Sequence, residues 1–253
     1  MKTHEQTVHE QFDSRAQAYL TSAVHAEGPD LVRVRELVAA SIPAEGVGLD
    51  LGCGAGHLSF ALAPLVARIV AVDASESMLA TVSHAAADKG VETRRAVAEN
   101  MPFEDATFHF AATRYSAHHW TDLSRAMDEM RRVVKPGGYL CVIDTEAPAH
   151  PLVDTHFQTI EFLRDRSHVR VRSATEWRRE FDRAGVDILE DGHWPVRIEF
   201  ASWVERMRTP QVKVDVLRTL QAEASREVRE ALSIEADGSF TMRTCLFWGR
   251  VRR

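Results

Sequence analysis

The stretch that decides the fold is Val47-Gly48-Leu49-Asp50-Leu51-Gly52-Cys53-Gly54-Ala55-Gly56, an apolar strand that runs directly into a glycine-rich turn. The segment that follows, residues 58–63, is rich in leucine and alanine and suits a helix. A strand, a glycine turn and a helix in this order place backbone N–H groups around a small polar ligand. The turn by itself predicts either a nucleoside-type cofactor site or a purely structural turn.

Short apolar runs and helix-like segments alternate along the rest of the chain. We expect strands at 68–73, 91–97, 107–114, 139–144, 186–190 and 240–251, and helices at 75–88, 122–134, 152–163 and 173–184. Ser75 is an expected N-cap, and Ser173 forms a capping-box pattern with Glu176. Lys135-Pro136-Gly137-Gly138 is a stop signal, and Gly185 suits the end of a helix. This alternation predicts a mostly parallel sheet with helices on both faces.

The length of 253 residues, 45% of them hydrophobic, favours one domain spanning residues 1–253. Residues 1–40 are helical in character and form an expected N-terminal cap, in which Phe12, Ala16 and Tyr19 share one face. The alternating pattern changes after Asp144. We interpret residues 146–172 and 194–236 as helical insertions on the substrate side, over one edge of the sheet.

Charge and cysteine content exclude several classes of protein. The chain has 31 basic and 37 acidic residues, a net charge of −6, so it shows no basic field for nucleic acid. No apolar run approaches the roughly 18–20 residues of a membrane span, and no secretory signal is visible. Cys53, Cys141 and Cys245 are far apart and odd in number, which favours a reduced cytoplasm. The histidines show no metal-ligand spacing, so we expect no metal.

Two carboxylates narrow the choice of cofactor. His57 stands where a dinucleotide motif has its third glycine, and Asp50 precedes the first glycine. A carboxylate repels a pyrophosphate but attracts an ammonium group, so both features point away from NAD. Asp73 ends the next strand and is placed to accept hydrogen bonds from ribose hydroxyls. The alternative for Asp73 is a structural role at the start of the helix that follows.

Further segments complete a family pattern: Val72-Asp73 followed by Ser77-Met78-Leu79, Ala98-Glu99-Asn100-Met101-Pro102-Phe103, Arg114-Tyr115-Ser116-Ala117-His118-His119-Trp120, and Val134-Lys135-Pro136-Gly137-Gly138. With them the chain, over residues 10–145, resembles a class I S-adenosylmethionine (SAM)-dependent methyltransferase of the type 11 domain. This group is similar to ubiquinone/menaquinone-biosynthesis methyltransferases. The resemblance implies an α/β, Rossmann-like, doubly wound sheet of seven strands, one of them antiparallel at 240–251.

The resemblance also implies which residues bind the cofactor, SAM. Those expected near its methionine moiety are Asp50, Gly52, Gly54, the backbone carbonyl of Arg114 and, as a cap, Tyr19. Those expected near its ribose and adenine are Asp73, Ala74, Met78, Ala98 and Glu99. Relatives often carry Asp at the position of Val97, so here Ala98 and Glu99 are left to contact the adenine edge.

A base is needed for methyl transfer only if the acceptor must lose a proton. His118 and His119 follow the strand at 107–114, at the edge where such sheets bind ligands. One of them, with His119 favoured, is expected to orient or deprotonate the acceptor; the alternative is a pair of polar linker residues. Tyr115 and Trp120 are expected either in the acceptor pocket or in the core.

Two other groups of residues have competing interpretations. For the charged stretch Arg164–Arg172 we favour a solvated face over a site for an acidic acceptor. The aromatic residues Trp194, Phe200 and Trp203 form either an apolar acceptor wall or a small satellite core.

The sequence therefore predicts a cytoplasmic SAM-dependent methyltransferase. It is expected to act on O, N or C of a small-molecule acceptor by in-line displacement and to release S-adenosylhomocysteine. Nucleic acid is a disfavoured acceptor, and a quinone-like molecule or a carrier protein is an alternative by family analogy. A SAM-binding regulatory or partner protein without catalysis is the alternative function. A nicotinamide-dependent oxidoreductase is disfavoured by Asp50 and His57.

Overall fold

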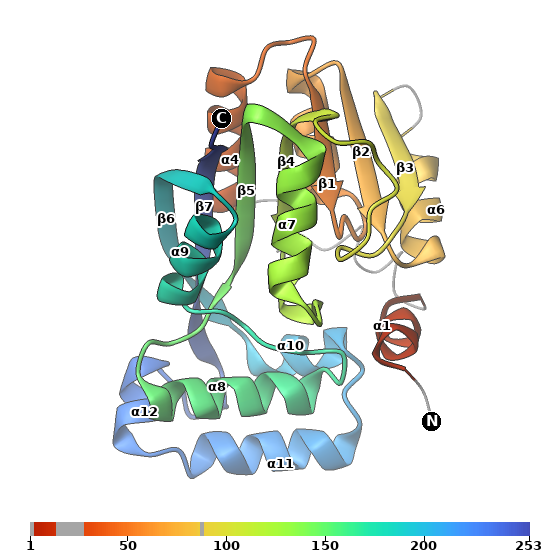
Figure 1. Ribbon diagram of the computed structural model, residues 1–253. Coiled ribbons are helices and arrows are strands. Elements are labelled where there is room, and N and C mark those ends of the chain that lie inside the picture. The colour runs from red at the N-terminus through yellow and green to blue at the C-terminus, as the bar shows by residue number, and fades with distance from the viewer. Residues whose placement is uncertain (1–2, 14–27, 87–88) are drawn as a thin grey trace.

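The computed structural model describes residues 3–13, 28–86 and 89–253 (Figure 1). Within these residues, seven strands form one sheet in the order β3-β2-β1-β4-β5-β7-β6. The strands are β1 (Val47–Leu51), β2 (Arg68–Asp73), β3 (Val91–Arg95), β4 (Phe108–Arg114), β5 (Val134–Glu146), β6 (Val186–Ile198) and β7 (Phe240–Val251). β7 runs antiparallel to both of its neighbours, and the other pairs are parallel. The predicted Rossmann-like sheet with one antiparallel strand is confirmed.

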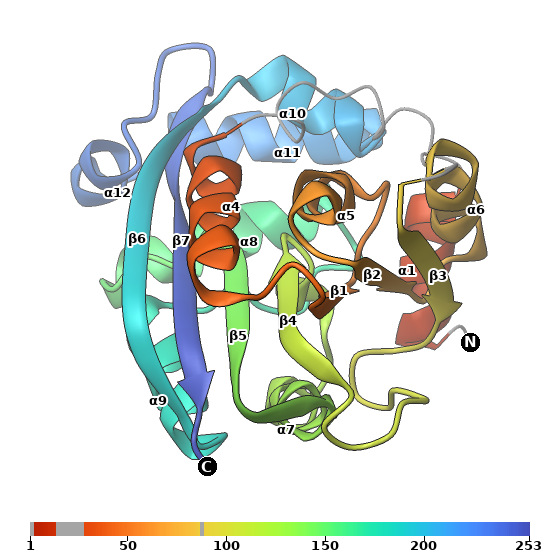
Figure 2. The same cartoon turned by 90° about the horizontal axis from the view of Figure 1, so that it is seen from above.

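Helices cover both faces of the sheet (Figure 2). One face carries α4 (Pro29–Ser41), α5 (His57–Leu62) and α6 (Glu76–Ala85); the other carries α7 (Leu123–Val133) and α9 (Ala174–Arg183). Two short 3-10 turns are η1 (Ala63–Leu65) and η2 (Ala117–His119), and α1 (His4–Asp13) lies near α6. The central strands are buried on both sides, as parallel strands between two helical layers must be.

The remaining helices form what we call the insertion layer, at the lower end of the sheet in Figure 1. It comprises α8 (Pro151–Arg164), α10 (Phe200–Arg206), α11 (Gln211–Ala222) and α12 (Arg226–Ala231). Phe157, Trp203 and Leu217 pack there against Phe240 at the start of β7. The layer thus has an apolar cluster of its own, joined to the sheet through β7. Among the described residues, none of the helices is long and apolar enough to cross a bilayer.

The predicted helix caps are present. The Ser75 hydroxyl accepts from the N–H of Met78 at the start of α6. Ser173 and Glu176 exchange both bonds of the capping box at the start of α9. Gly185 follows α9 with φ of 72°, a conformation that favours glycine. These local signals were strong because each satisfies backbone groups that a helix end leaves without partners.

Several predicted boundaries are wrong. β6 continues to Ile198, so the second insertion begins after this strand and not at residue 194. The longer strand contains Pro195, and it can do so because β6 is an edge strand and therefore tolerates a residue without an N–H. The strand at 91–97 ends at Arg95, and the helix at 75–88 ends at Ala85.

The stop signal at 135–138 ends α7 as expected, but β5 already begins at Val134. Pairing with β4 shifts from Phe108–Val134 to Phe110–Tyr139, so the Pro-Gly-Gly segment is accommodated as a bulge within the strand. The aromatic face expected at Phe12, Ala16 and Tyr19 lies outside the described side chains.

A pair of phenylalanines on α8 tests the packing of the insertion layer. Phe157 is fully buried in the apolar cluster, whereas Phe162 is 56% exposed. We expect Phe157→Ala to lower the free energy of unfolding by about 3–5 kcal/mol because it leaves a cavity. The matched control Phe162→Ala should cost roughly 0.5 kcal/mol or less. Denaturant titration measures both, and equal losses would contradict the assigned packing.

Candidate active site

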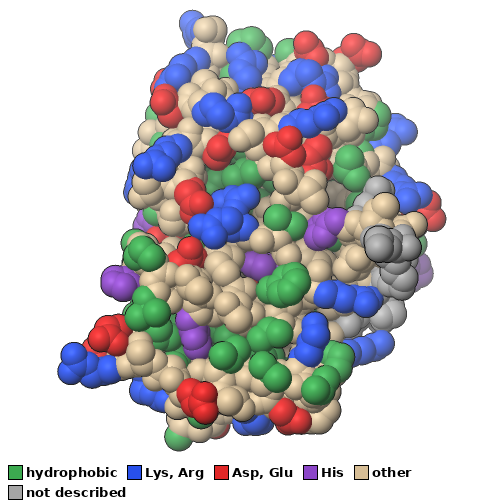
Figure 3. Space-filling view, turned by 60° about the horizontal axis from the view of Figure 1, so that its bottom comes forward, with side chains coloured by type: hydrophobic (Ala, Val, Ile, Leu, Met, Phe, Trp, Pro, Cys, Tyr) green, Lys and Arg blue, Asp and Glu red, His purple; other side chains and the backbone are tan. Residues whose placement is uncertain are grey.

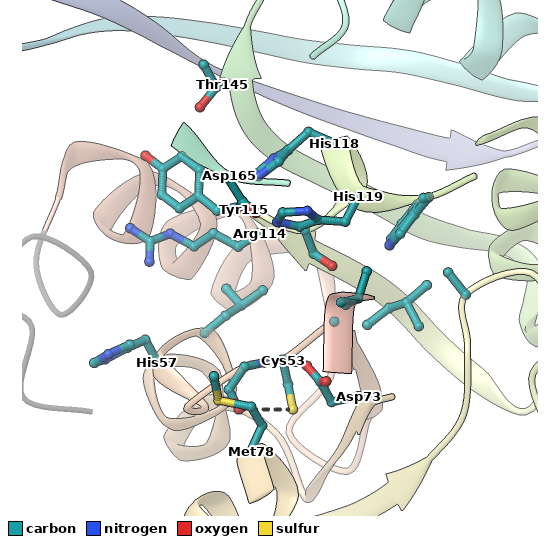
Figure 4. Close-up of a pocket in the computed structure, with 18 of the residues that line it drawn as sticks. Cys53, His57, Asp73, Met78, Arg114, Tyr115, His118, His119, Thr145 and Asp165 are labelled. Carbon is teal, nitrogen blue, oxygen red and sulfur yellow. Dashed lines mark hydrogen bonds between the residues drawn. The ribbon is translucent and has the colours of Figure 1, made fainter. Parts of the chain in front are cut away.

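A cavity of about 970 Å³ lies between the carboxyl ends of the central strands and the insertion layer. Its lining has two sides, which Figure 4 shows facing each other. We call one the glycine-turn side, with Asp50, Gly52, Gly54, Asp73 and Met78, and the other the histidine side, with Tyr115, His118, His119, Thr145 and Asp165. Ligands bind at this edge of doubly wound sheets because the crossovers leave a crevice there.

The glycine turn needs glycine for two different reasons. Gly52 has φ of 68°, and a Cβ there would lie 1.9 Å from the Ser116 hydroxyl. Gly54 has φ of 49°, but a Cβ would meet nothing within 4 Å. The backbone at Gly54 therefore faces open space, which leaves room for a ligand to approach it closely.

Asp50 is buried at the end of β1 with half of its carboxylate unsatisfied. Its Oδ2 accepts from the Ser59 hydroxyl at 2.6 Å, whereas Oδ1 has no hydrogen-bond partner among the described residues. Burial raises the pKa of Asp50 to about 7. A buried acceptor without a donor is costly, and an ammonium group of a ligand is the partner that would satisfy it. The glycine-turn side thus fits the amino-acid end of SAM.

Asp73 braces the glycine turn from the end of β2. Its Oδ2 accepts from the N–H of Gly54 and its Oδ1 from the N–H of Ser75, both at 2.9 Å. The structural role weighed from the sequence is therefore present. A carboxylate oxygen has more than one lone pair, so these bonds leave capacity for hydroxyl donors.

Some of the other predicted cofactor residues also combine a place in the cavity wall with a structural bond. Ala74, Met78, Ala98, Glu99 and Arg114 all line the cavity. The Glu99 carboxylate accepts from Thr121 and Asp122 and so also holds the start of α7. The Arg114 guanidinium forms a buried ion pair with Asp30 at 2.5 Å. Tyr19 lies outside the described residues.

His118 and Asp144 form a hydrogen-bonded dyad. The Asp144 carboxylate accepts from the ring Nδ1 of His118 at 2.7 Å and from its backbone N–H at 3.1 Å. It also accepts from the N–H of Thr145, so it acts as a pure acceptor and places the imidazole proton on Nδ1. The Nε2 atom makes no hydrogen bond with a described residue. Burial opposes a charge on the ring, but the charge and hydrogen bond of Asp144, together with the charges of Glu161 and Asp165, outweigh burial and raise the pKa of His118 above 6.5.

His119 has a different environment although its ring centroid lies 4.1 Å from that of His118. Its Nδ1 donates to the carbonyl oxygen of Ser167 at 3.0 Å. Burial and the neighbouring His118 lower the pKa of His119 to about 4, so its ring is neutral at physiological pH. The His118 ring is thus hydrogen-bonded to a carboxylate, whereas Nδ1 of His119 is hydrogen-bonded to a backbone carbonyl.

The structure adds a residue that we had not singled out, Asp144, which bonds to His118 although it is not among the residues that line the cavity. Asp144 ends a predicted strand as Asp73 does, and this shared position was a usable signal. The expectation of a solvated face for the stretch 164–172 is wrong in part. His168 is 5% exposed, and Arg164 lines the cavity while paired with Glu161 at 2.9 Å. We predicted that the basic side chains of this stretch face solvent because the sequence does not show which carboxylates lie beside them in the fold.

The structure also decides in part whether the aromatic residues line the cavity or belong to the core. Trp203 belongs to the apolar cluster of the insertion layer and lines the cavity as well, whereas Phe200 lies in the cluster. Trp194 packs against the core on the α4 face. Tyr115 and Trp120 both line the cavity. Across the described part of the chain, no group of three or more His, Cys, Asp or Glu is arranged to hold a metal ion.

Comparison with known proteins places this site in a family. Residues 49–142 match the methyltransferase domain model. The chain is 44% identical to the protein YafE of Escherichia coli (strain K12) over 195 residues, 75% of this chain and 93% of YafE. It is 35% identical to the methyltransferase YcgJ of Bacillus subtilis (strain 168) over 226 residues, 88% of each. The crystal structure of YcgJ superposes with a TM-score of 0.83 at 32% identity and covers 88% of this chain and 98% of YcgJ.

A third relative has a named substrate. The demethylmenaquinone methyltransferase of Clavibacter sepedonicus is 30% identical over 196 residues, 76% of this chain and 78% of the relative. The sequence matches, the shared structure and the cavity beside the glycine turn agree with one another. The chain belongs to the class I methyltransferases, enzymes that use S-adenosylmethionine as the methyl donor.

Proposed function

We propose that this enzyme methylates an oxygen, nitrogen or carbon atom of a small-molecule acceptor, with His118 as the general base. The observation that carries the proposal is the His118–Asp144 dyad, whose imidazole lines the cavity that is also lined by the glycine turn. The sequence favoured His119, but the carboxylate partner and the raised pKa support His118. His119 remains a candidate for orienting the acceptor.

The residues on the glycine-turn side would hold the cofactor. The unsatisfied Oδ1 of Asp50 supports binding of an ammonium group, and the open approach to Gly54 supports close contact with the backbone. Asp73 would bind the ribose, while Ala74, Met78, Ala98 and Glu99 would surround the adenine. Bound SAM supplies an electrophilic methyl group whose leaving group is already in place.

The chain itself then has to orient the acceptor, exclude water and remove a proton. His118 Nε2 would take the proton of an acceptor hydroxyl or amine, and Asp144 would stabilise the imidazolium that forms. Thr145 and Asp165 stand beside it on the histidine side and offer polar contacts to the acceptor. The apolar side chains of Trp203, Met207 and Met242 would contact its carbon skeleton.

A quinone-like ring is the acceptor class that the relatives favour. The demethylmenaquinone methyltransferase of C. sepedonicus carries that substrate in its name, and the similarity covers 76% of this chain. The net charge of −6 argues against a nucleic-acid acceptor.

The pH dependence of SAM binding tests the role of Asp50. Only the ionised carboxylate attracts an ammonium group, and the pKa of Asp50 is about 7. We expect the Kd for SAM to rise about tenfold for each pH unit below 7 and to level off above it, until the amino group of SAM itself titrates at about 7.7–8.0. Asp50→Asn should weaken binding about 30-fold or more at neutral pH and abolish this slope.

Calorimetric titration with SAM measures both effects. Asp105→Asn is the matched control because the Asp105 side chain is 79% exposed, and it should bind SAM as the wild type does. A Kd for Asp50→Asn within twofold of the wild type would refute the ammonium contact.

Replacement of His118 tests the base. His118→Gln should lower the rate of S-adenosylhomocysteine release about 10²- to 10⁴-fold with the Kd for SAM unchanged, because the proton of the acceptor loses its receiver. A base works in its neutral form, so the wild-type rate should rise with pH through a pKa above 6.5, and the variant should lose this dependence. His119→Gln is the neighbouring comparison. Wild-type rates in His118→Gln would remove the base role.

The class of acceptor is tested by offering purified fractions together with SAM. We expect S-adenosylhomocysteine release with low-molecular-mass metabolites, hydroquinones among them, and none with total RNA. The physical reason is that the insertion layer bounds one side of the cavity and the net charge of −6 gives no basic field. Mass spectrometry of the methylated product identifies the acceptor, and methylated RNA would contradict the proposal.

A further inference from the structure

The loop between α8 and α9, residues 165–171, holds His118 from the side opposite Asp144; we call it the histidine loop. The N–H groups of Val169 and Arg170 donate to the carbonyl oxygen of His118 at 2.9 and 3.1 Å. Asp144 accepts the N–H of His118 on the other side. Both main-chain groups of His118 are therefore fixed, one by β5 and one by the histidine loop.

Gln158 on α8 ties this loop to the insertion layer with four hydrogen bonds. Its Oε1 accepts from the N–H of Val171 at 3.1 Å and from Nε2 of His168 at 2.9 Å. Its Nε2 donates to the carbonyl of Val171 at 2.8 Å and to Oδ1 of Asp154 at 2.9 Å. Both amide protons and both oxygen lone pairs are in use. The anchored residues 168 and 171 flank the two N–H groups that grip His118.

The same amide fixes the protonation of His168. Because the N–H of Val171 makes Oε1 an acceptor, His168 must carry its proton on Nε2. His168 is buried, its Nδ1 has no partner among the described residues, and its ring centroid lies 6.0 Å from that of His118. Burial lowers the pKa of His168 to about 3, so this ring stays neutral. A cation at this position would oppose the protonation of His118.

Charged and titratable groups face His118 from every element around it. They are Asp144 from β5, Glu161 from α8, Asp165 and His168 from the histidine loop, and His119 from η2. Gln158 is uncharged and is not among the residues that line the cavity. Any effect of Gln158 on His118 must therefore pass through the loop. Figure 3 brings the lower end of the molecule in Figure 1 toward the viewer and shows several histidine side chains at that surface.

We propose that Gln158 is a positioning residue for His118: by anchoring Val171 and His168 to α8, it holds the N–H groups of Val169 and Arg170 against the His118 carbonyl and keeps the ring aligned with Asp144. This inference rests on the proposed function, in which His118 is the base. It gives the insertion layer a part in setting up the base, in addition to enclosing the acceptor.

The test compares Gln158→Met with Gln211→Met. Gln211 donates to Asp215 four residues later on α11, as Gln158 is bonded to Asp154 on α8, but it lies far from the loop in the sequence and is exposed. Methionine keeps the length of the side chain and removes its hydrogen bonds. Imidazole ¹⁵N shifts of His118, assigned with His118→Gln, are followed against pH, and amide hydrogen exchange is measured at Val169 and Arg170.

In Gln158→Met we expect the pKa of His118 to fall, because burial then acts with less opposition from Asp144, and its ring to become a mixture of tautomers. Exchange at Val169 and Arg170 should be at least about tenfold faster. Gln211→Met should match the wild type. Unchanged His118 titration and exchange in folded Gln158→Met would overturn the proposal, whatever the loss of thermal stability.

If Gln158→Met does not fold, amide hydrogen exchange of the wild-type protein still tests the proposal. Anchoring by Gln158 predicts that the amides of Val169, Arg170 and Val171 exchange with a common opening free energy. Exchange at Val171 more than about tenfold faster than at the other two would refute it. None of these readouts uses turnover, so a fully active His118→Gln would refute the role of base while leaving the anchoring of the loop to be judged by itself.

Discussion

Parallel strands deliver their carboxyl ends to one edge of the sheet, and in this protein three aspartates stand at or near those ends. Asp50 is the last residue but one of β1, beside the glycine turn. Asp73 is the last residue of β2, and Asp144 lies near the end of β5. Asp50 accepts from a serine hydroxyl on α5. Asp73 accepts from backbone N–H groups after β1 and after β2, and Asp144 from backbone N–H groups of η2 and of β5. The cavity, the turn and the dyad all depend on this arrangement.

The three carboxylates differ in how many of their oxygens accept a hydrogen bond. Asp73 and Asp144 have donors on both oxygens, whereas Asp50 has one oxygen with none. Burial therefore raises the pKa of Asp50. When no ligand ammonium group is bound, this raised pKa lowers the free energy of unfolding as the pH rises from 3.8 to about 7. An ammonium partner would offset that cost, so under the proposed function a destabilised group in the free protein would become a source of affinity in the complex.

The histidine side is built by parts of the chain that are distant in sequence. η2 carries His118 and His119, β5 carries Asp144, and α8 with the loop after it supplies the bonds that hold both histidines. This explains how two neighbouring imidazoles acquire opposite shifts in pKa. The His118 ring donates to a carboxylate, which favours its positive charge. The His119 ring donates to a carbonyl, and its own protonation is opposed by the neighbouring His118.

The sequence by itself determined the sheet, the helix caps and the glycine-turn side of the site. Those features depend on short-range signals: the period of apolar residues, serines before helices, and glycines where φ is positive. Boundaries failed where position in the sheet overrode local preference, as for Pro195 in the edge strand β6 and the Pro-Gly-Gly bulge in β5. The tertiary structure alone decided the pairing of His118 with Asp144, the neutrality of His119 and His168, and the ion pair of Arg164 with Glu161. Each of these depends on which side chains meet across the fold, and a pKa or an ion pair is set by those neighbours and not by the residue type.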